Sequence, residues 1–231
     1  MAVQLELQSV SKSFGATRVL QDFSLLLNEG DCVALLGSNG SGKSTVIKLL
    51  SGQNDPSRGL ARALGLPDGS WPQCVSLAAP YTELFEEFTP REHLSWHEKF
   101  QPLRVSAADA LTLLDLPEAA WDRPIKSFSS GMKQRVKLAA AILANTPILL
   151  LDEPFAGIDP IAVIEIQRII GFLKSRGIGV LITDHNVRET LGICDHASII
   201  SEGRVLAEGT PEEIVNNPEV RRVYLGENFR M

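Results

Sequence analysis

The 231-residue sequence predicts an α/β fold built around a mainly parallel sheet. Three largely apolar runs, at residues 32–36, 148–151 and 180–183, are typical of strands that are buried on both faces. Helical patterns separate these runs, and an alternation of strands and helices favours parallel pairing. Two additions to this core are expected: an N-terminal antiparallel β subdomain and a helical lobe over residues 85–127.

Length and composition indicate one globular domain that spans residues 1–231, in which residues 1–84 and 128–231 form the core around the inserted lobe. The longest apolar stretch, at residues 138–151, is interrupted by Asn145 and Pro147 and is too short to span a bilayer. The first residues carry neither a basic leader nor an apolar secretory core, so a cytoplasmic protein is expected.

Charge and cysteine content narrow the class of partner. A formal net charge of −6 argues against nucleic acid and against an anionic membrane surface as partners. The three cysteines, Cys32, Cys74 and Cys194, form no metal-binding spacing, which indicates spectator thiols in a reducing compartment.

The N-terminal half begins with strands and continues into helices. Apolar and polar residues alternate around Leu5 and Leu27, which predicts antiparallel strands. After the strand at 32–36 we expect a glycine-rich loop and a helix over residues 44–51. Residues 52–73 are rich in Gly, Pro, Asp and Ser and indicate loops with short strands. Helices are expected over residues 91–100 and from Ser106 onward.

The C-terminal half carries helix start signals. A helix is expected to begin near Ser129, because apolar residues recur after it at helical spacing. Asp159 and Pro160 supply an N-cap and a first-turn proline for a helix that ends at Gly177. The sequence from Thr210 to Glu213 is a capping box that opens a late helix.

A glycine-rich loop between a buried strand and a helix matches the phosphate-binding pattern G-x-x-x-x-G-K-[ST]. Its backbone N–H groups can surround phosphates, Lys43 can reach the β and γ oxygens of a nucleotide, and the Ser44 hydroxyl can ligate Mg²⁺. The alternative is a chance glycine turn. The expected nucleotide-binding residues of this loop are Gly37, Ser38, Asn39, Gly40, Ser41, Gly42, Lys43, Ser44 and Thr45.

Two adjacent carboxylates follow the apolar run at 148–151. Ligands of open α/β sheets bind at the carboxyl ends of strands, so Asp152 is expected to hold Mg²⁺ through water and Glu153 to polarise the attacking water. Adjacent acids are also common as helix caps. Together with the phosphate loop, however, the pair predicts Mg²⁺-dependent hydrolysis of the bound nucleotide.

Over essentially its whole length the sequence resembles the ABC ATPase family, whose fold is a P-loop NTPase core with an antiparallel subdomain and a helical lobe. The segment at 129–135, SSGMKQR, is similar to the family's LSGGQ signature, with Phe128 in place of Leu. A serine that only caps a helix is the alternative. The resemblance implies that the signature residues Ser129, Ser130, Gly131 and Met132 contact the ATP of a partner subunit.

The resemblance assigns four further positions. Ile158 and Asp159 resemble the D-loop at the dimer interface, and His185 resembles the switch histidine that contacts the γ-phosphate. Phe14 resembles the aromatic residue that stacks on adenine, with Val19 beside it. The alternatives are a structural histidine and a core phenylalanine.

One family feature is missing. A Gln that touches Mg²⁺ usually follows the strand before the helical lobe, but residues 75–82 read VSLAAPYT and Gln73 precedes them. Thr82, or backbone and water, could substitute, and no residue is assigned to this role.

The resemblance implies an ATPase subunit that dimerises on ATP, reopens after hydrolysis and drives transmembrane transporter subunits from the cytoplasmic face of the inner membrane. Two alternatives stay open: a soluble ABC protein of DNA repair or translation, and an ATP-dependent dimerising module without a transport role.

Residues from about 150 onward also resemble the ATPases of lipopolysaccharide export, whereas the first part resembles another bacterial ABC subgroup. The sequence therefore suggests either a chimera joined between Ala139 and Leu151 or a divergent natural paralogue.

Overall fold

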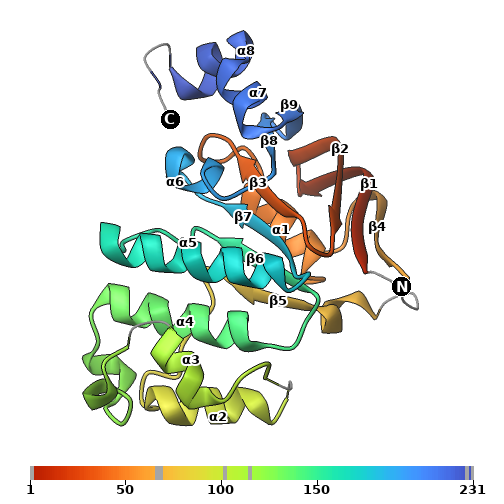
Figure 1. The fold of residues 1–231 in the computed structure, drawn as a ribbon. Coiled ribbons are helices and arrows are strands. Elements are labelled where there is room, and N and C mark those ends of the chain that lie inside the picture. The colour runs from red at the N-terminus through yellow and green to blue at the C-terminus, as the bar shows by residue number, and fades with distance from the viewer. Residues whose placement is uncertain (1–2, 66–69, 101–102, 114–115, 227–228, 230–231) are drawn as a thin grey trace.

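The computed structural model describes residues 3–65, 70–100, 103–113, 116–226 and 229. The described chain forms an antiparallel sheet, a larger mainly parallel sheet and helices around them (Figure 1). This architecture confirms the α/β prediction, including the antiparallel subdomain.

The antiparallel sheet has the strand order β2-β1-β4. Its strands are β1 (Gln4–Phe14), β2 (Thr17–Asn28) and β4 (Arg58–Leu64). Alternate residues of β1 are buried, as the period-two pattern around Leu5 and Leu7 predicts. The third strand comes from the segment that the sequence indicated only as loops with short strands.

The larger sheet has the order β5-β6-β7-β3-β8-β9. Its first five strands are parallel and β9 pairs antiparallel with β8. The strands are β5 (Val75–Ala78), β6 (Ile148–Asp152), β7 (Gly179–Thr183), β3 (Cys32–Leu36), β8 (His196–Ser201) and β9 (Arg204–Gly209).

Two hydrophobic cores cover the two faces of this sheet. Val33 and Leu35 face the core shared with the antiparallel sheet and α1 (Lys43–Leu50), whereas Ala34 and Leu36 face the core under α4 (Ser130–Leu143) and α5 (Pro160–Ser175). All five residues of β3 are buried. The largely apolar runs of the sequence follow from this two-sided burial.

The helical lobe contains α2 (Pro90–Glu98) and α3 (Ala107–Leu113), which pack against α4 at one end of the molecule (Figure 1). A capping box between Thr89 and Glu92 opens α2, and the Ser106 hydroxyl accepts the Asp109 N–H at the start of α3. The lobe also holds the 3₁₀ turns Glu118–Ala120 and Ile125–Ser127.

The remaining elements are short. They are α6 (Val187–Leu191), α7 (Pro211–Asn216), α8 (Pro218–Val220), the 3₁₀ turn Trp71–Cys74 and a π-helical turn, Arg221–Leu225. The Thr210–Glu213 capping box opens α7 as predicted. Among the described residues, no helix is long and apolar enough to cross a membrane.

Candidate functional site

The predicted phosphate loop, acidic pair and histidine follow three neighbouring parallel strands, β3, β6 and β7. The carboxyl ends of parallel strands meet at one edge of a sheet, which is where open α/β folds bind ligands. The fold therefore brings together residues that are more than a hundred positions apart in the sequence.

The phosphate loop reverses between β3 and α1 through glycines with positive φ. Gly42, which precedes α1, has a φ of 115°. At Gly37 a Cβ atom would lie 2.2 Å from the carbonyl oxygen of Ile200, so a side chain does not fit there. Ser38, Asn39 and Gly40 are exposed, and Ser44 and Thr45 lie in the first turn of α1. The loop thus presents backbone and hydroxyl groups at a helix N-terminus.

Lys43 is almost buried, and its ammonium group donates hydrogen bonds to the carbonyl oxygens of Gly37 at 2.8 Å and Ser38 at 3.1 Å. Burial lowers its pKa, while the carboxylates of Asp152, Glu153 and Asp184 act in the opposite direction. These three carboxylates therefore lie close enough to Lys43 to share one electrostatic environment.

The two acids after β6 differ in setting. Asp152 is buried and accepts a hydrogen bond from the Thr183 hydroxyl, whereas Glu153 is half-buried. Glu153 has a φ of 52°, which is unusual for a residue with a side chain, and its N–H donates to the Thr183 carbonyl at 2.7 Å. Glu153 also lines a cavity of about 770 Å³ with the loop after β5 and the start of α4. Its carboxylate thus has access to a solvent-filled space.

His185 lies directly after Asp184 at the end of β7. The Asp184 carboxylate is fully buried and accepts the N–H groups of Phe155 at 2.9 Å and Asn186 at 2.8 Å. Burial raises the pKa of Asp184. His185 Nδ1 is 3.5 Å from an Asp184 oxygen, and its side chain is 60% exposed. The imidazole is therefore anchored at one nitrogen and presented outward, unlike a histidine that is enclosed by packing.

Ser44 and Asp152 provide hydroxyl and carboxylate oxygens, the donor types that Mg²⁺ prefers. The described residues contain no cluster of three or more His, Cys, Asp or Glu side chains that could hold a metal. These two side chains supply only part of the oxygen ligands that Mg²⁺ needs, so phosphate and water oxygens would have to complete its coordination. The residues present therefore fit a magnesium ion that binds together with a nucleotide.

Phe14 is the last residue of β1, and Val19 lies near the start of β2. Phe14 is 48% exposed, with the Lys12 ammonium 5.0 Å from its ring centre, so it is not the core phenylalanine of the alternative interpretation. An exposed ring suits base stacking, and that role stays a prediction.

The signature segment begins α4. The Ser129 hydroxyl accepts the Met132 N–H at 3.3 Å and so caps the helix, while Ser129 and Ser130 are exposed. Gly131 lies against the loop at 156–159, because a Cβ there would come within 3.9 Å of the Gly157 oxygen. Asp159 caps α5 through the Ala162 N–H at 3.0 Å and Ile158 packs at the edge of the core. Signature and D-loop residues are therefore adjacent in one chain.

The signature and the phosphate loop are not adjacent in this way. Helix α4 packs beside β5 at the edge of the sheet, and the strands β6 and β7 separate β5 from β3. A site that uses both motifs needs a signature from a second copy.

Two tyrosines were not singled out from the sequence. The Tyr81 ring lies 4.6 Å from the Lys48 ammonium, and burial together with the charge of Asp152 raises the pKa of its hydroxyl. The Tyr224 hydroxyl accepts a hydrogen bond from the Gly37 N–H, although burial raises its pKa on balance. No local motif marks either residue, since each reaches the site through tertiary packing.

The segment at 75–82 offers no glutamine to this site. The Thr82 hydroxyl donates to the Ala79 carbonyl at 2.6 Å and accepts the Ala79 N–H at 3.3 Å, so it is engaged within its own turn. Gln73 lies in the 3₁₀ turn before β5.

Comparison with known proteins identifies the family. The family model described as "ABC transporter" matches residues 20–156, and one described as "Branched-chain amino acid ATP-binding cassette transporter" matches residues 204–230. A solved structure described as an ATP-binding subunit of an ABC transporter superposes with a TM-score of 0.83 and 32% identity, covering 94% of each chain.

Curated relatives match nearly the whole chain. The lipopolysaccharide export system ATP-binding protein LptB of Escherichia coli K12 is 40% identical, covering 98% of this chain and 99% of the relative. LptB of Acidithiobacillus ferridurans is 41% identical with both chains fully covered. The likeness to these proteins therefore runs through the suggested junction between Ala139 and Leu151 and is not limited to residues from about 150 onward.

Proposed function

The chain belongs to the ATP-binding subunits of ABC transporters and is an ATPase of that family, and we propose that it powers the export of lipopolysaccharide. The observation that carries the catalytic part is the grouping of Lys43 with the carboxylates of Asp152, Glu153 and Asp184 at the ends of three adjacent strands. The proposed substrate, lipopolysaccharide, is supported by the names of the relatives and by their match over nearly the full length of the chain.

In the proposed reaction the phosphate loop binds the β- and γ-phosphates through its N–H groups, and Lys43 exchanges the carbonyls of Gly37 and Ser38 for phosphate oxygens. Ser44 and Asp152 would hold Mg²⁺, which neutralises charge on the transferring phosphoryl group. Glu153 accepts a proton from the attacking water, and His185 donates to the γ-phosphate.

Hydrolysis in this proposal takes place in a dimer of two identical chains. The signature residues Ser129 and Ser130 are exposed at the N-terminus of a 14-residue helix, where they can meet the γ-phosphate bound to a second copy. Contacts that need the γ-phosphate exist only before hydrolysis, so cleavage of ATP would favour reopening.

The described helices cannot cross a membrane, so the proposal requires transmembrane subunits as partners. It places the chain on the cytoplasmic face of the inner membrane. The lobe over residues 85–127 is expected to dock these partners, because it presents the exposed Phe85 and Phe100 side chains.

The substrate can be tested in Escherichia coli cells depleted of their own LptB. We expect the chain to restore growth and to co-purify with the lipopolysaccharide-export membrane subunits, and the matched variant Glu153→Gln to co-purify without restoring growth. If the chain hydrolyses ATP and co-purifies with those subunits but fails to support growth, the proposed substrate is wrong and the ATPase assignment stands.

A further inference from the structure

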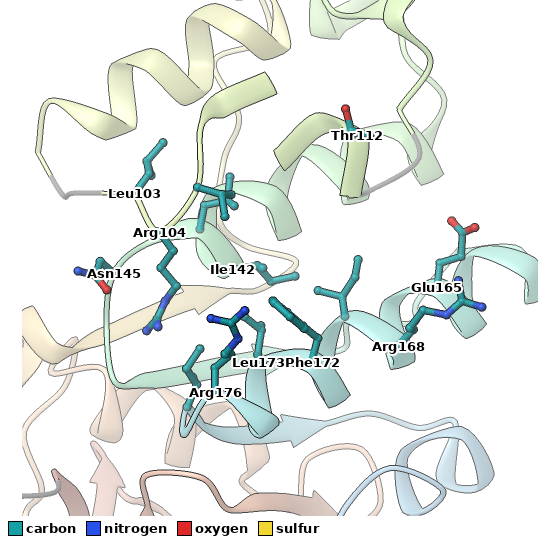
Figure 2. Close-up of a pocket in the computed structure, with 14 residues that line it drawn as sticks. Leu103, Arg104, Thr112, Ile142, Asn145, Glu165, Arg168, Phe172, Leu173 and Arg176 are labelled. Atoms are coloured by element: carbon teal, nitrogen blue, oxygen red, sulfur yellow. The ribbon is translucent and has the colours of Figure 1, made fainter. Parts of the chain in front are cut away.

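A second cavity, of about 860 Å³, lies far from the phosphate loop, between α3 and the C-terminal halves of α4 and α5 (Figure 2). Its lining includes Leu143, at the end of α4 before β6, and Ile178, directly before β7. The cavity therefore lies at the amino ends of the parallel strands, whereas the nucleotide motifs follow their carboxyl ends. Its volume is in the range of sites for small organic ligands.

The inner wall of the cavity is apolar. Ile142, Leu143, Ile169, Leu173 and Ile178 line it, and each is buried in the folded chain. Phe172, which is 47% exposed, stands at the rim. An apolar alkyl chain or ring system of a ligand would therefore be more stable against this wall than in water.

The rim of the cavity is cationic, in contrast to the chain's net charge of −6. The lining contains Arg104, Arg168 and Arg176 against a single acid, Glu165, so three positive charges and one negative charge give +2 locally. The sign of this charge, set against an acidic protein, points to an anionic ligand.

One of the three arginines is already engaged. Arg104 donates to the carbonyl oxygens of Ala144 and Thr146 in the segment that follows α4, and burial lowers its pKa. Its guanidinium therefore satisfies carbonyl groups in the chain that leaves α4.

The other two arginines are available to a ligand. Within the described residues, neither the Arg168 nor the Arg176 guanidinium forms a hydrogen bond or an ion pair, and Arg176 lies 4.9 Å over the Phe172 ring. Figure 2 shows the Arg176 guanidinium beside Phe172, whereas the Arg168 side chain extends from α5 toward Glu165. Guanidinium groups bind carboxylate or phosphate through paired N–H donors.

We infer that this cavity binds an amphipathic anion, with the anionic group at Arg176, the apolar body against the α4–α5 wall and Arg168 adding positive charge to the same rim. A medium-chain carboxylate is the simplest ligand of this class. A ligand in this position would contact α3 of the helical lobe and α5 of the core together. The site is separate from the nucleotide site, so the inference does not depend on the proposed transport substrate.

The test is titration calorimetry of the full chain with dodecanoate below its micelle concentration, in the presence of saturating ADP. One dodecanoate per chain is expected to bind, and dodecanol, which has the same chain without the charge, is expected to bind at least tenfold more weakly. An alkyl phosphate of equal length distinguishes phosphate from carboxylate as the preferred anion.

The variant Arg176→Gln is expected to weaken dodecanoate binding at least fivefold, and Arg168→Gln, which removes a more distant positive charge of the same rim, is expected to weaken it by a smaller factor. Arg58→Gln, on the exposed strand β4, removes the same charge elsewhere and is expected to leave binding unchanged. All three side chains are exposed, so the variants are expected to fold. Equal binding of dodecanol, equal weakening by all three variants, or no binding by the parental chain would each overturn the inference.

Discussion

At the residue scale, the site combines groups that are costly to bury with groups that compensate for them. Lys43 is desolvated beside three carboxylates, and Asp184 is fully buried with two backbone N–H donors on its oxygens. Glu153 adopts a left-handed backbone conformation, which costs about 1–3 kcal/mol and is typical of functional positions. The fold thus holds the Lys43 ammonium group in a fixed position, where it can stabilise the negative charge of a bound phosphate group.

Replacing Lys43 with Ala is expected to weaken ATP binding by about ten- to hundredfold, because charged hydrogen bonds contribute about 1.5–3 kcal/mol. Fluorescence titration with a labelled nucleotide measures the dissociation constant. Lys99→Ala, at an exposed position after α2, serves as the control and is expected to bind normally. An unchanged affinity in Lys43→Ala would refute the phosphate-loop assignment.

The positions of the phosphate loop and the acidic pair at the ends of buried strands could be predicted from the sequence, because each motif is a contiguous string. Tyr81 and Tyr224 could not, since neither belongs to a local pattern. Tyr224 reaches Gly37 only because the C-terminal turn at 221–225 folds back over the phosphate loop. The exposure of Phe14 could not be predicted either, because the sequence around a single phenylalanine does not distinguish an exposed ring from one in the core.

At the element scale, helix α4 has a structural and a proposed functional role at the same residue. Ser129 caps the helix through the Met132 N–H, so loss of activity in a Ser129 variant could reflect lost stability. The two roles differ in what they require. A cap needs only an acceptor oxygen, whereas a γ-phosphate site excludes negative charge.

The variant Ser129→Asp separates these roles. Aspartate caps helices as well as serine does, so the free energy of unfolding is expected to stay within about 0.5 kcal/mol, whereas Ser129→Ala is expected to lose about 1 kcal/mol. ATP turnover in Ser129→Asp is expected to fall at least tenfold, because the carboxylate repels the phosphate of the partner's nucleotide. Full turnover in Ser129→Asp would show that Ser129 is a cap alone.

Helix α2 buries His93, whose Nδ1 has no hydrogen-bond partner among the described residues. Burial, with a smaller contribution from His97, lowers the pKa of His93 to about 4. Between this value and the unfolded value of about 6.5 the unfolded chain binds more protons. Stability is therefore complete above about pH 6.5 and decreases as the pH falls toward 4.

Urea denaturation as a function of pH tests this titration. The wild-type chain is expected to lose up to about 3 kcal/mol more than His93→Phe between pH 7 and pH 4. The exposed His196→Gln is the control and is expected to follow the wild type. Parallel curves for His93→Phe and the wild type would show that His93 is not kept neutral by burial.

At the scale of the whole molecule, sheet order decides which motifs meet within one chain. The strands β6, β7 and β3 are neighbours, so the acids, the histidine and the phosphate loop converge. The signature segment lies beside β5, away from these motifs, which is why the proposed reaction uses the signature of a second chain. This order was not predictable from the sequence, because parallel strands that are distant in sequence pair through nonlocal contacts.

Other global features were also beyond sequence patterns. Strand β4 pairs with β1 although its segment is rich in turn residues, and β9 closes the sheet in the antiparallel direction. Conversely, the Asp159 cap with Pro160 marked the start of α5 correctly, and the Thr210–Glu213 capping box marked that of α7, because capping depends only on adjacent residues.

In the proposed reaction Glu153 activates water for cleavage of ATP held at Lys43. The most direct test of this role is the steady-state rate of Mg²⁺-dependent phosphate release by the purified Glu153→Gln variant, with ATP affinity measured in parallel. Glutamine keeps the size and hydrogen-bonding reach of glutamate but is not a base, so the rate is expected to fall at least a hundredfold with ATP affinity within about twofold of the wild type. Phosphate release at the wild-type rate would contradict the account.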